Sequence, residues 1–390
     1  MKVVYLDNNA TTKVADEVRE SMMPFLDDLY GNPSSMHTFG GQIHRNIEIA
    51  REQIAALINA EPEEIIFTSC GTESDNTAIM SALHTRPEKR HIITSRVEHP
   101  AILNYCKTMG RRGYRVTYLP VDRLGRLNLD ELDSAIDDDT AIVSIMYANN
   151  ESGVIFPVKE IARIVKSKGI PFHTDAVQTT GKIPVDVKQL PCDMMSISGH
   201  KMHAPKGVAA LFIRRGTRFA PYIIGGHQES GRRGGTENVA SIVGFGVAGE
   251  LARKHVETGS TKMRELRDKL QQGLLDKCPG ARVNGDPLNR TPNTLNISFE
   301  YVEGEAILLK INEYNICASS GSACTSGSLE PSHVLRSMGV PFTAIHGSVR
   351  FSLSRYTADE EIDFVLEKMP PIINELRELS PFGRDVKNVT

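Results

Sequence analysis

The feature that most constrains the fold is a regular alternation of two sequence patterns between residues 64 and 213. Short apolar runs rich in β-branched residues alternate with helical patterns; the runs are EIIFT, HIITS, RVTYLPV, AIVSIMYA, PFHTD, MMSIS and VAALFIR. Such runs are typical of buried strands, and their alternation with helices is typical of β/α units around a mainly parallel sheet. We therefore expect an α/β fold with helices flanking that sheet.

After residue 236 the pattern changes, and 390 residues exceed the size of one typical core. Helices are expected near 237–255, 260–277, 303–313 and 358–378, with short strands near 281–283 and 293–298. We predict a large domain of residues 14–257 and a smaller α/β domain of residues 1–13 and 258–390. We expect the helix at 14–26 to pack with the smaller domain.

Composition excludes several classes of function. A net charge of -3 provides no broad basic field, so neither a nucleic-acid partner nor an anionic membrane is expected. The start, MKVVYLDNNATT, is too polar for a signal peptide, and no stretch has the roughly 20 apolar residues of a membrane span. The six cysteines form no CxxC pair, so we expect neither disulfides nor a zinc site. We expect a cytoplasmic protein.

Lys201 stands at the end of a predicted strand, in the run Ser198-Gly199-His200-Lys201 after MMSIS. A buried lysine is costly to keep charged, and a lysine of lowered pKa can form an imine with an aldehyde cofactor. Ser198 and His200 could hold a phosphate. A lysine taken at random would instead lie at the surface with its amine in water, so this hypothesis depends on the neighbouring motifs.

Two neighbouring motifs also follow predicted strands. Asp175 comes directly after PFHT, at the edge where open α/β sheets place ligands, and its carboxylate can pair with a protonated pyridine nitrogen. The alternative for Asp175 is a helix N-cap. The run from Ser69 to Asp75 follows EIIFT and begins a helical pattern. Its N–H groups and the Thr72 hydroxyl would suit a phosphate, or would simply cap the helix.

His99 and Asn150 are weak candidates when taken alone. His99, in RVEHPAI, could stack on a flat ring and transfer protons near neutral pH, or could cap a helix end. Asn150, in NNESG, could be only a turn residue. Neither residue indicates a function without the other motifs.

Cys324 differs from the other cysteines because it lies in SSGSACTSGS, where Gly and Ser replace apolar neighbours. We expect an accessible thiol on a mobile loop, which makes it a candidate nucleophile. The other glycine-rich stretch, 223–238, is expected to be a lid or ligand loop. Arg350, within the apolar run SVRFSLSRY, would bind either a substrate carboxylate or an internal Asp or Glu.

Together these segments resemble the cysteine desulfurases of the NifS/IscS type, which are fold type I pyridoxal 5'-phosphate (PLP) enzymes related to class V aminotransferases. The resemblance runs almost end to end, through YLDNNATT, GNPSS, GTESDN, EHPAI, NNESG, HTDAVQ, SGHKMHAPKG, RRGGTEN, SSGSAC and VRFSLSRY. Any one motif would be weak, but the ordered combination is specific. RRGGTEN and the long loop around Cys324 look more like the NifS-like branch.

The resemblance implies a role for each candidate residue in a large PLP-binding domain. Lys201 would hold PLP as an imine, Asp175 would pair with the pyridine nitrogen, and His99 would lie over the ring. The phenolic oxygen would contact Gln178 and Asn150, and the phosphate would contact Gly71, Thr72, Ser198, His200 and the partner subunit's Thr236. The substrate carboxylate would bind Asn150 and Arg350.

The same resemblance implies a homodimeric sulfurtransferase that converts L-cysteine to L-alanine. Lys201 would move the Cα proton, and the Cys324 thiolate would attack the substrate sulfur and become a persulfide. A free cysteine has a pKa of about 8.5, so a proton acceptor is needed at neutral pH, and His99 is a candidate acceptor for the proton of the substrate thiol. An iron–sulfur scaffold protein or another acceptor would take the sulfur. No metal site is implied.

Two alternatives stay open. Another PLP enzyme of this fold, an aminotransferase or a selenocysteine lyase, would use Lys201 and Asp175 equally well, although Cys324 argues against an aminotransferase. A non-enzymatic scaffold could bind a metal through His200, His203 and the cysteines, although it would have no need of Lys201.

Overall fold

The structure is a computed structural model that describes residues 2–320 and 331–380. Its main sheet has seven strands in the order β2-β8-β7-β6-β5-β3-β4. The strands are Ile65–Thr68 (β2), His91–Ser95 (β3), Arg115–Leu119 (β4), Thr140–Ser144 (β5), Phe172–Asp175 (β6), Met194–Ser198 (β7) and Ala209–Ile213 (β8). Strands β3 to β7 pair in parallel, and β8 is antiparallel to both neighbours. The predicted mainly parallel α/β sheet is confirmed.

Successive side chains along each strand enter different cores, because a strand points alternate residues to opposite faces. Ile92, Ile142, Met194 and Leu211 pack in one cluster with the helices Gly71–Thr85 (α3) and Pro100–Arg111 (α4). Their neighbours Ile93, Val143, Met195 and Phe212 belong to the cluster on the other face. Helices Thr38–Leu57 (α2), Leu129–Ala135 (α5) and Val158–Ser167 (α6) contribute to that cluster. Burial on both faces explains why the strands are almost continuously apolar.

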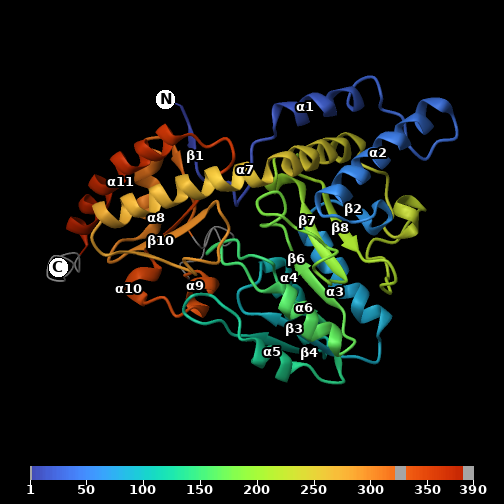
Figure 1. The fold of residues 1–390 in the computed structure, drawn as a ribbon, viewed down its shortest axis with the longest axis horizontal. Coiled ribbons are helices and arrows are strands. Elements are labelled where there is room, and N and C mark those ends of the chain that lie inside the picture. Colours follow the sequence, from blue (N-terminus) through green and yellow to red (C-terminus); the bar gives the residue numbers. More distant parts are fainter. Residues whose placement is uncertain (1, 321–330, 381–390) are drawn as a thin grey trace.

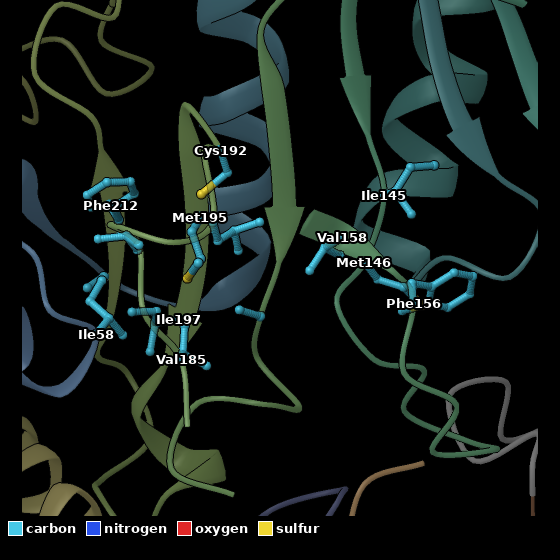
Figure 2. Packing of buried hydrophobic residues seen from close by; sticks show 14 of the residues in the cluster. Ile58, Ile145, Met146, Phe156, Val158, Val185, Cys192, Met195, Ile197 and Phe212 are labelled. Carbon is cyan, nitrogen blue, oxygen red and sulfur yellow. The ribbon is translucent and has the colours of Figure 1, made fainter. Parts of the chain in front are cut away.

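Figure 2 shows part of the larger cluster from close by. Phe212, Met195 and Ile197 project from their strands and lie near Ile58 and Val185, which come from other parts of the chain. A sheet with apolar side chains packed on both faces leaves only its edges and strand ends for polar chemistry.

A second, smaller region lies at the other end of the molecule (Figure 1). It contains the antiparallel sheet β12-β10-β9, made of Ser348–Ser352, Thr294–Phe299 and Ala281–Val283, and the parallel pair Val4–Tyr5 (β1) and Ile316–Cys317 (β11). Its helices are Gly304–Asn312 (α8), His333–Ser337 (α9), Phe342–Ile345 (α10) and Asp359–Leu379 (α11). A separate apolar cluster fills this region with side chains from β1, β10, β12 and α11.

The two helices expected at 237–255 and 260–277 are one continuous helix, Val239–Lys277 (α7). In Figure 1 it runs along both regions of the molecule. A glycine inside a helix is unfavourable by about 1 kcal/mol, which tertiary contacts can offset. Here Ser260, next to Gly259, donates its hydroxyl to the carbonyl of Lys182, so packing holds the helix together at the expected break.

The expectation that residues 14–26 pack with the smaller domain was wrong. The helix Asp16–Met22 (α1) buries Val18 in the larger cluster. It lies against α7 at Gly244, where an added Cβ would be 2.7 Å from Met22 and 3.2 Å from Val18. The absence of a side chain at Gly244 therefore permits this close approach, which periodicity alone does not reveal.

The predicted boundary at residues 257 and 258 lies inside α7, and the division into domains stays a prediction. The two apolar clusters divide the chain in a similar way, except that Val334, Leu335, Met338 and Ile345 belong to the larger one. Among the described ranges, no helix combines the length and apolar character that a membrane span requires.

Candidate active site

The predicted site segments meet at one edge of the main sheet because parallel strands end on the same side. The segments that begin at Gly71, His99, Asp175 and Lys201 follow β2, β3, β6 and β7. Asn9, which is almost fully buried, connects several of them. Its backbone carbonyl accepts hydrogen bonds from Lys201 and Gln178, and its side chain donates to the carbonyl of Asn150.

Lys201 ends a short 3-10 turn, Gly199–Lys201, that directly follows β7. Its ammonium group lies inside this convergence, where Nζ donates to the carbonyls of Asn9 at 2.6 Å and Ala10 at 2.7 Å. The close turn needs Gly199, because an added Cβ would lie 3.1 Å from the carbonyl oxygen of Val208. The alternative of a lysine with its amine in water is therefore wrong for Lys201.

A cup for an anionic group lies beside Lys201. Helix α3 begins at Gly71, and the N–H groups of its first turn have no helical carbonyl to bind. An added Cβ at Gly71 would lie 3.1 Å from Val177 and 3.6 Å from Ser198, so the cup is already tight. The buried hydroxyl of Ser198 has no hydrogen-bond partner among residues 2–320 and 331–380. An unpaired buried hydroxyl at a helix N-terminus suits a ligand with acceptor oxygens, such as a phosphate.

Thr72 is the second residue of α3, and His200 follows Ser198 by two positions. Thr72 is exposed and lines a cavity of about 930 Å³ together with His99. His200 bonds through Nδ1 to the hydroxyl of Thr11 at 3.2 Å. Burial, with the nearby Lys201 ammonium, lowers the pKa of His200 to about 4, so the imidazole is neutral at physiological pH. Contact of either residue with a phosphate stays a prediction.

Asp175 is the last residue of β6, and its Oδ1 accepts the backbone N–H of Val177 at 2.9 Å. Residues 176–183 form turns, so the alternative of a helix N-cap is wrong. Burial raises the pKa of the Asp175 carboxyl to about 6, against the opposing effects of the Val177 N–H and the Lys201 charge. A cationic nitrogen placed here would stabilise the carboxylate.

A row of polar side chains continues from Asp175 into the sheet. His173 lies between the hydroxyls of Ser144 and Ser196, each at 2.9 Å, and its Nε2 is 3.7 Å from the buried carboxyl of Asp75. Burial lowers the pKa of His173 to about 3 and raises that of Asp75 well above its usual value. Burial thus favours the neutral form of both groups. The sequence analysis missed this row, whose signal was polar letters inside the runs PFHTD, AIVSIMYA and MMSIS.

His99 caps helix α4, as the alternative interpretation expected, because its Nδ1 accepts the N–H of Ala101 at 3.1 Å. Burial, with Lys201 and His333 nearby, lowers the pKa of His99 to about 4. A neutral imidazole whose Nδ1 accepts a hydrogen bond carries its proton on Nε2. At neutral pH His99 therefore offers a donor, and its ring lines the cavity of about 930 Å³ beside Tyr105 and Tyr222.

Arg350, in the middle of β12, reaches the same junction from the smaller region. Its Nη2 donates to Asp7 Oδ1 at 2.8 Å and its Nη1 donates to the carbonyl of Asn150 at 3.1 Å. The internal carboxylate that the sequence left open is thus Asp7. Arg350 Nε is buried without a hydrogen-bond partner in the described part of the chain. Binding of a substrate carboxylate by Arg350 and Asn150 stays a prediction.

The glycine-rich stretch 223–238 is anchored at two points. Glu229 is buried and accepts two hydrogen bonds from Arg51, at 2.7 and 2.9 Å, and Arg233 pairs with Glu73 of α3 at 3.0 Å. Thr236 near the end of this stretch is exposed. Within the described residues it makes no hydrogen bond to the cup. Cys324 lies outside the described residues.

No group of three or more His, Cys, Asp or Glu side chains that could hold a metal ion occurs in residues 2–320 and 331–380. The structure instead brings together the Lys201 amine, the Asp175 carboxylate and the anion cup at the ends of neighbouring strands, with Arg350 from the smaller region. This set can hold a phosphorylated aromatic aldehyde and place an amino acid beside it.

The pattern of the class-V aminotransferase family matches residues 4–365 of the chain. A protein named cysteine desulfurase from Trichormus azollae is 62% identical over 99% of this chain and 96% of its own length. The cysteine desulfurase NifS of Azotobacter vinelandii is 57% identical over 98% of this chain and 95% of its own length.

Solved structures also superpose on this chain. A NifS-like protein superposes with a TM-score of 0.91 at 42% identity, covering 96% of this chain and all of that one. A structure of SspA in complex with cysteine superposes with a TM-score of 0.80 at 36% identity, covering 91% of this chain and 99% of that one.

Proposed function

The chain belongs to the class-V aminotransferase family and is a cysteine desulfurase that uses PLP, and from this premise we propose which residues perform its chemistry. The observation that carries the proposal is the juxtaposition of Lys201 with the tight cup of Gly71 and the unpaired Ser198 hydroxyl. An amine beside an anion cup is what a phosphorylated aldehyde requires.

The described residues fit this cofactor. Gly71, Thr72, Ser198 and His200 would hold the phosphate, Asp175 would pair with the ring nitrogen, and Lys201 would anchor the aldehyde carbon. The raised pKa of Asp175, about 6, supports the pairing because a partner cation would restore its charge. Gln178 and Asn150 would lie at the phenolic oxygen and His99 over the ring. When bound, PLP supplies an electron sink that weakens the bonds at the substrate Cα.

L-cysteine would be held at its carboxylate by Arg350 and Asn150. A planar guanidinium binds a carboxylate through two parallel hydrogen bonds, and Arg350 is held in place by Asp7 and the Asn150 carbonyl. The substrate carboxylate must therefore share or replace the Asp7 contact. Lys201 would then move the proton of Cα, because its amine lies where the cofactor and substrate meet.

Cys324 would take the sulfur. Its thiolate attacks the substrate sulfur, a bond between the two sulfur atoms forms, and the C–S bond breaks. The electron pair of that bond stays with the carbon skeleton, which gains a proton and leaves as L-alanine, while Cys324 carries a persulfide. The resemblance and the glycine-rich sequence around Cys324 support this assignment.

The structure sharpens the role proposed for His99. Because Nδ1 accepts the Ala101 N–H, proton exchange with the substrate thiol must take place at Nε2. At neutral pH that atom carries a proton, so we propose that His99 covers the ring and donates a hydrogen bond from Nε2. It could accept a thiol proton only if Nδ1 gave up its own bond.

We propose that two copies form a homodimer in which Thr236 completes the phosphate cup of the other copy. The support is exposure: Thr236 is exposed near the end of an anchored loop, and large apolar side chains are exposed nearby in sequence and between residues 23 and 39. These apolar residues are Met23, Leu26, Tyr30, Met36, Phe39, Tyr222 and Ile224. Exposed large apolar side chains, where they gather into a patch, are typical of a protein interface.

Subunit mixing tests the dimer. Thr236→Glu would repel the partner's phosphate and Lys201→Ala would remove the anchor, so each variant alone should be inactive. In a two-fold dimer, one site of each mixed pair would contain neither change. Equal mixing with subunit exchange should therefore restore activity at about a quarter of the sites. No recovery, or a fully active monomer in equilibrium sedimentation, would contradict the proposal.

We further propose that the persulfide serves iron–sulfur cluster assembly or another sulfur acceptor, in the cytoplasm. The support is the name NifS of one relative and the free thiols of Cys70, Cys106, Cys192, Cys278 and Cys317, which are usual in a reducing compartment.

Mass spectrometry after a brief exposure to L-cysteine tests the central assignment. The wild-type protein should gain one sulfur atom on Cys324. Cys324→Ala should bind PLP normally but form neither persulfide nor appreciable alanine, whereas the control Cys70→Ala, which removes an exposed thiol elsewhere in the chain, should still form the persulfide. Sulfur found on Cys70 or another cysteine instead of Cys324 would overturn the assignment.

A further inference from the structure

Lys182 is a buried lysine that the proposed chemistry does not use. It follows β6 by seven positions in the turn QTTGKIP, and only 6% of the residue is exposed. No carboxylate of the described residues forms an ion pair with it. A buried amine without a counter-ion is unfavourable, and a methionine of similar length would fill the same space without that penalty. The position therefore calls for a function of the amine itself.

The amine of Lys182 holds two amide groups by their oxygen atoms. Nζ donates to Gln178 Oε1 at 2.5 Å and to Asn9 Oδ1 at 3.0 Å. The orientation of the Asn9 amide is fixed separately, because Asn293 also donates to Oδ1 while the Asn9 Nδ2 donates to Thr294 Oγ1. Lys182 therefore faces an acceptor on each side.

The orientation of Gln178 follows from these contacts. Its Oε1 faces Lys182, and its Nε2 donates one hydrogen to the Asn9 carbonyl at 3.1 Å, the same carbonyl that Lys201 binds. The second hydrogen of Nε2 then points away from Lys182. A glutamine amide can flip by half a turn, so its donor end is defined only by its neighbours.

We propose that Lys182 is a positioning residue that turns the donor end of Gln178 toward the phenolic oxygen of PLP. The inference rests on the proposed function, which places Gln178 at that oxygen, and names one of the two groups that orient the Gln178 amide. Without the Lys182 amine, Oε1 would lose its partner among the described residues, and only the bond from Nε2 to the Asn9 carbonyl would hold the amide against a flip.

The turn that carries Lys182 is held on both sides. Gly181 has a φ of 79° and packs against Ala252 of α7 and Met202, and the carbonyl of Lys182 accepts the hydroxyl of Ser260. The backbone of Lys182 is thus held independently of the Gln178 contact. A substitution at Lys182 should leave this turn in place.

Charged and titratable groups around the amine are cations or neutral histidines. Burial lowers the pKa of Lys182 well below its usual value, and the charges of Lys201 and Arg350 lower it further. Lys182 in turn lowers the pKa of His200 and of His203. Charged or neutral, Lys182 retains at least two hydrogens for its two acceptors.

The test is the pH titration of the cofactor's absorbance in the PLP-loaded protein. A donor at the phenolic oxygen stabilises its negative charge and lowers the pKa of the bound cofactor, so its loss should raise that pKa. We expect Lys182→Met to raise the midpoint by roughly half a pH unit or more, the effect of one hydrogen bond. Gln178→Ala should raise it at least as much.

Double variants distinguish an effect of Lys182 through Gln178 from a direct effect of the Lys182 charge on the cofactor. If Lys182 acts through Gln178, the variant Gln178→Ala/Lys182→Met should titrate like Gln178→Ala alone. Lys182→Gln retains a donor and should shift the midpoint less than Lys182→Met. The control Lys188→Met removes an exposed lysine six residues after Lys182 and should titrate like the wild type.

Three results would overturn the inference: an unshifted Lys182→Met, additive shifts in the double variant, or an unshifted Gln178→Ala. A variant that loses the fold is recognised by its circular dichroism, and Lys182→Gln then decides. If the wild-type protein bound no PLP and showed no cofactor absorbance, the proposed function itself would fail, which is a different outcome.

Discussion

The segments that follow β6 and β7 both bring a lysine amine to Asn9, yet their environments differ. Lys201 meets the backbone carbonyl of Asn9 beside a cup that contains an unpaired hydroxyl. Lys182 meets the side-chain oxygen of the same residue and is enclosed by protein amides. Within the described residues, the Lys201 amine thus contacts backbone carbonyls, whereas the Lys182 amine contacts two side-chain amides.

The two lysines near Asn9 are suited to different tasks, covalent chemistry for Lys201 and orientation of a neighbouring side chain for Lys182. An amine used in covalent chemistry must be able to leave its resting contacts, and backbone carbonyls are weak partners that a cofactor can replace. An amine that orients a neighbour needs contacts that do not change. Substitutions in the two segments should therefore have effects of very different size.

The largest effect is expected for Lys201→Ala. Turnover should fall by at least about 10³, since the proton shuttle is lost, and the protein-bound imine absorbance should disappear with it. Lys182→Met is the matched comparison and should retain the absorbance with turnover reduced by less than about tenfold. If Lys201→Ala formed alanine at the wild-type rate, the proposed difference in role between Lys201 and Lys182 would be wrong.

Asp175→Asn should have the next largest effect. Asparagine keeps an oxygen for the Val177 N–H but cannot hold a charge beside the ring nitrogen, so kcat should fall by about 10² to 10³. Steady-state kinetics at saturating PLP measure this. Asp186→Asn, a change to a partly exposed carboxylate farther along the same segment, should leave kcat unaltered. Equal losses in both variants would point to damaged folding instead of lost charge.

Ser198→Ala tests whether the hydroxyl at the end of β7 contributes to cofactor binding. The Ser198 hydroxyl has no partner among the described residues, and we propose that the phosphate supplies one, so the variant should weaken PLP binding by about tenfold while kcat at saturating PLP stays the same. Titration of the cofactor-free protein with PLP gives the dissociation constant. Ser167→Ala on the exposed surface of α6 is the control. An unchanged dissociation constant would place the phosphate elsewhere.

The smallest effect is expected from pH. Burial raises the pKa of Asp175 to about 6 in the cofactor-free protein, so the carboxylate that favours a cationic ring nitrogen is present above that pH and is lost as the pH falls through it. PLP affinity should therefore fall between about pH 7 and pH 5, by less than tenfold per unit. Asp175→Asn should lack this component. An identical pH dependence in both proteins would exclude Asp175 as its source.

Much of the fold could be predicted from local patterns. Each apolar run of the large sheet became a strand within a few residues of its expected bounds, because a strand buried on both faces must be apolar throughout. The continuity of α7 through Gly259 and the packing of α1 could not be predicted. Both depend on contacts between distant segments, Ser260 with Lys182 and Gly244 with Val18.

The site shows the same division. The sequence alone placed Lys201, Asp175 and Gly71 at strand ends, and parallel strands make such ends converge whatever the details of packing. Only the tertiary structure revealed that Arg350 is paired with Asp7, that His99 has its Nδ1 engaged, and that Lys182 lies beside Gln178. No periodicity distinguishes Lys182 from an exposed lysine, because its burial is created by α7 and Asn9, which are distant in sequence. Strand ends are a local property of the chain, whereas hydrogen-bond partners and burial are properties of the packed whole.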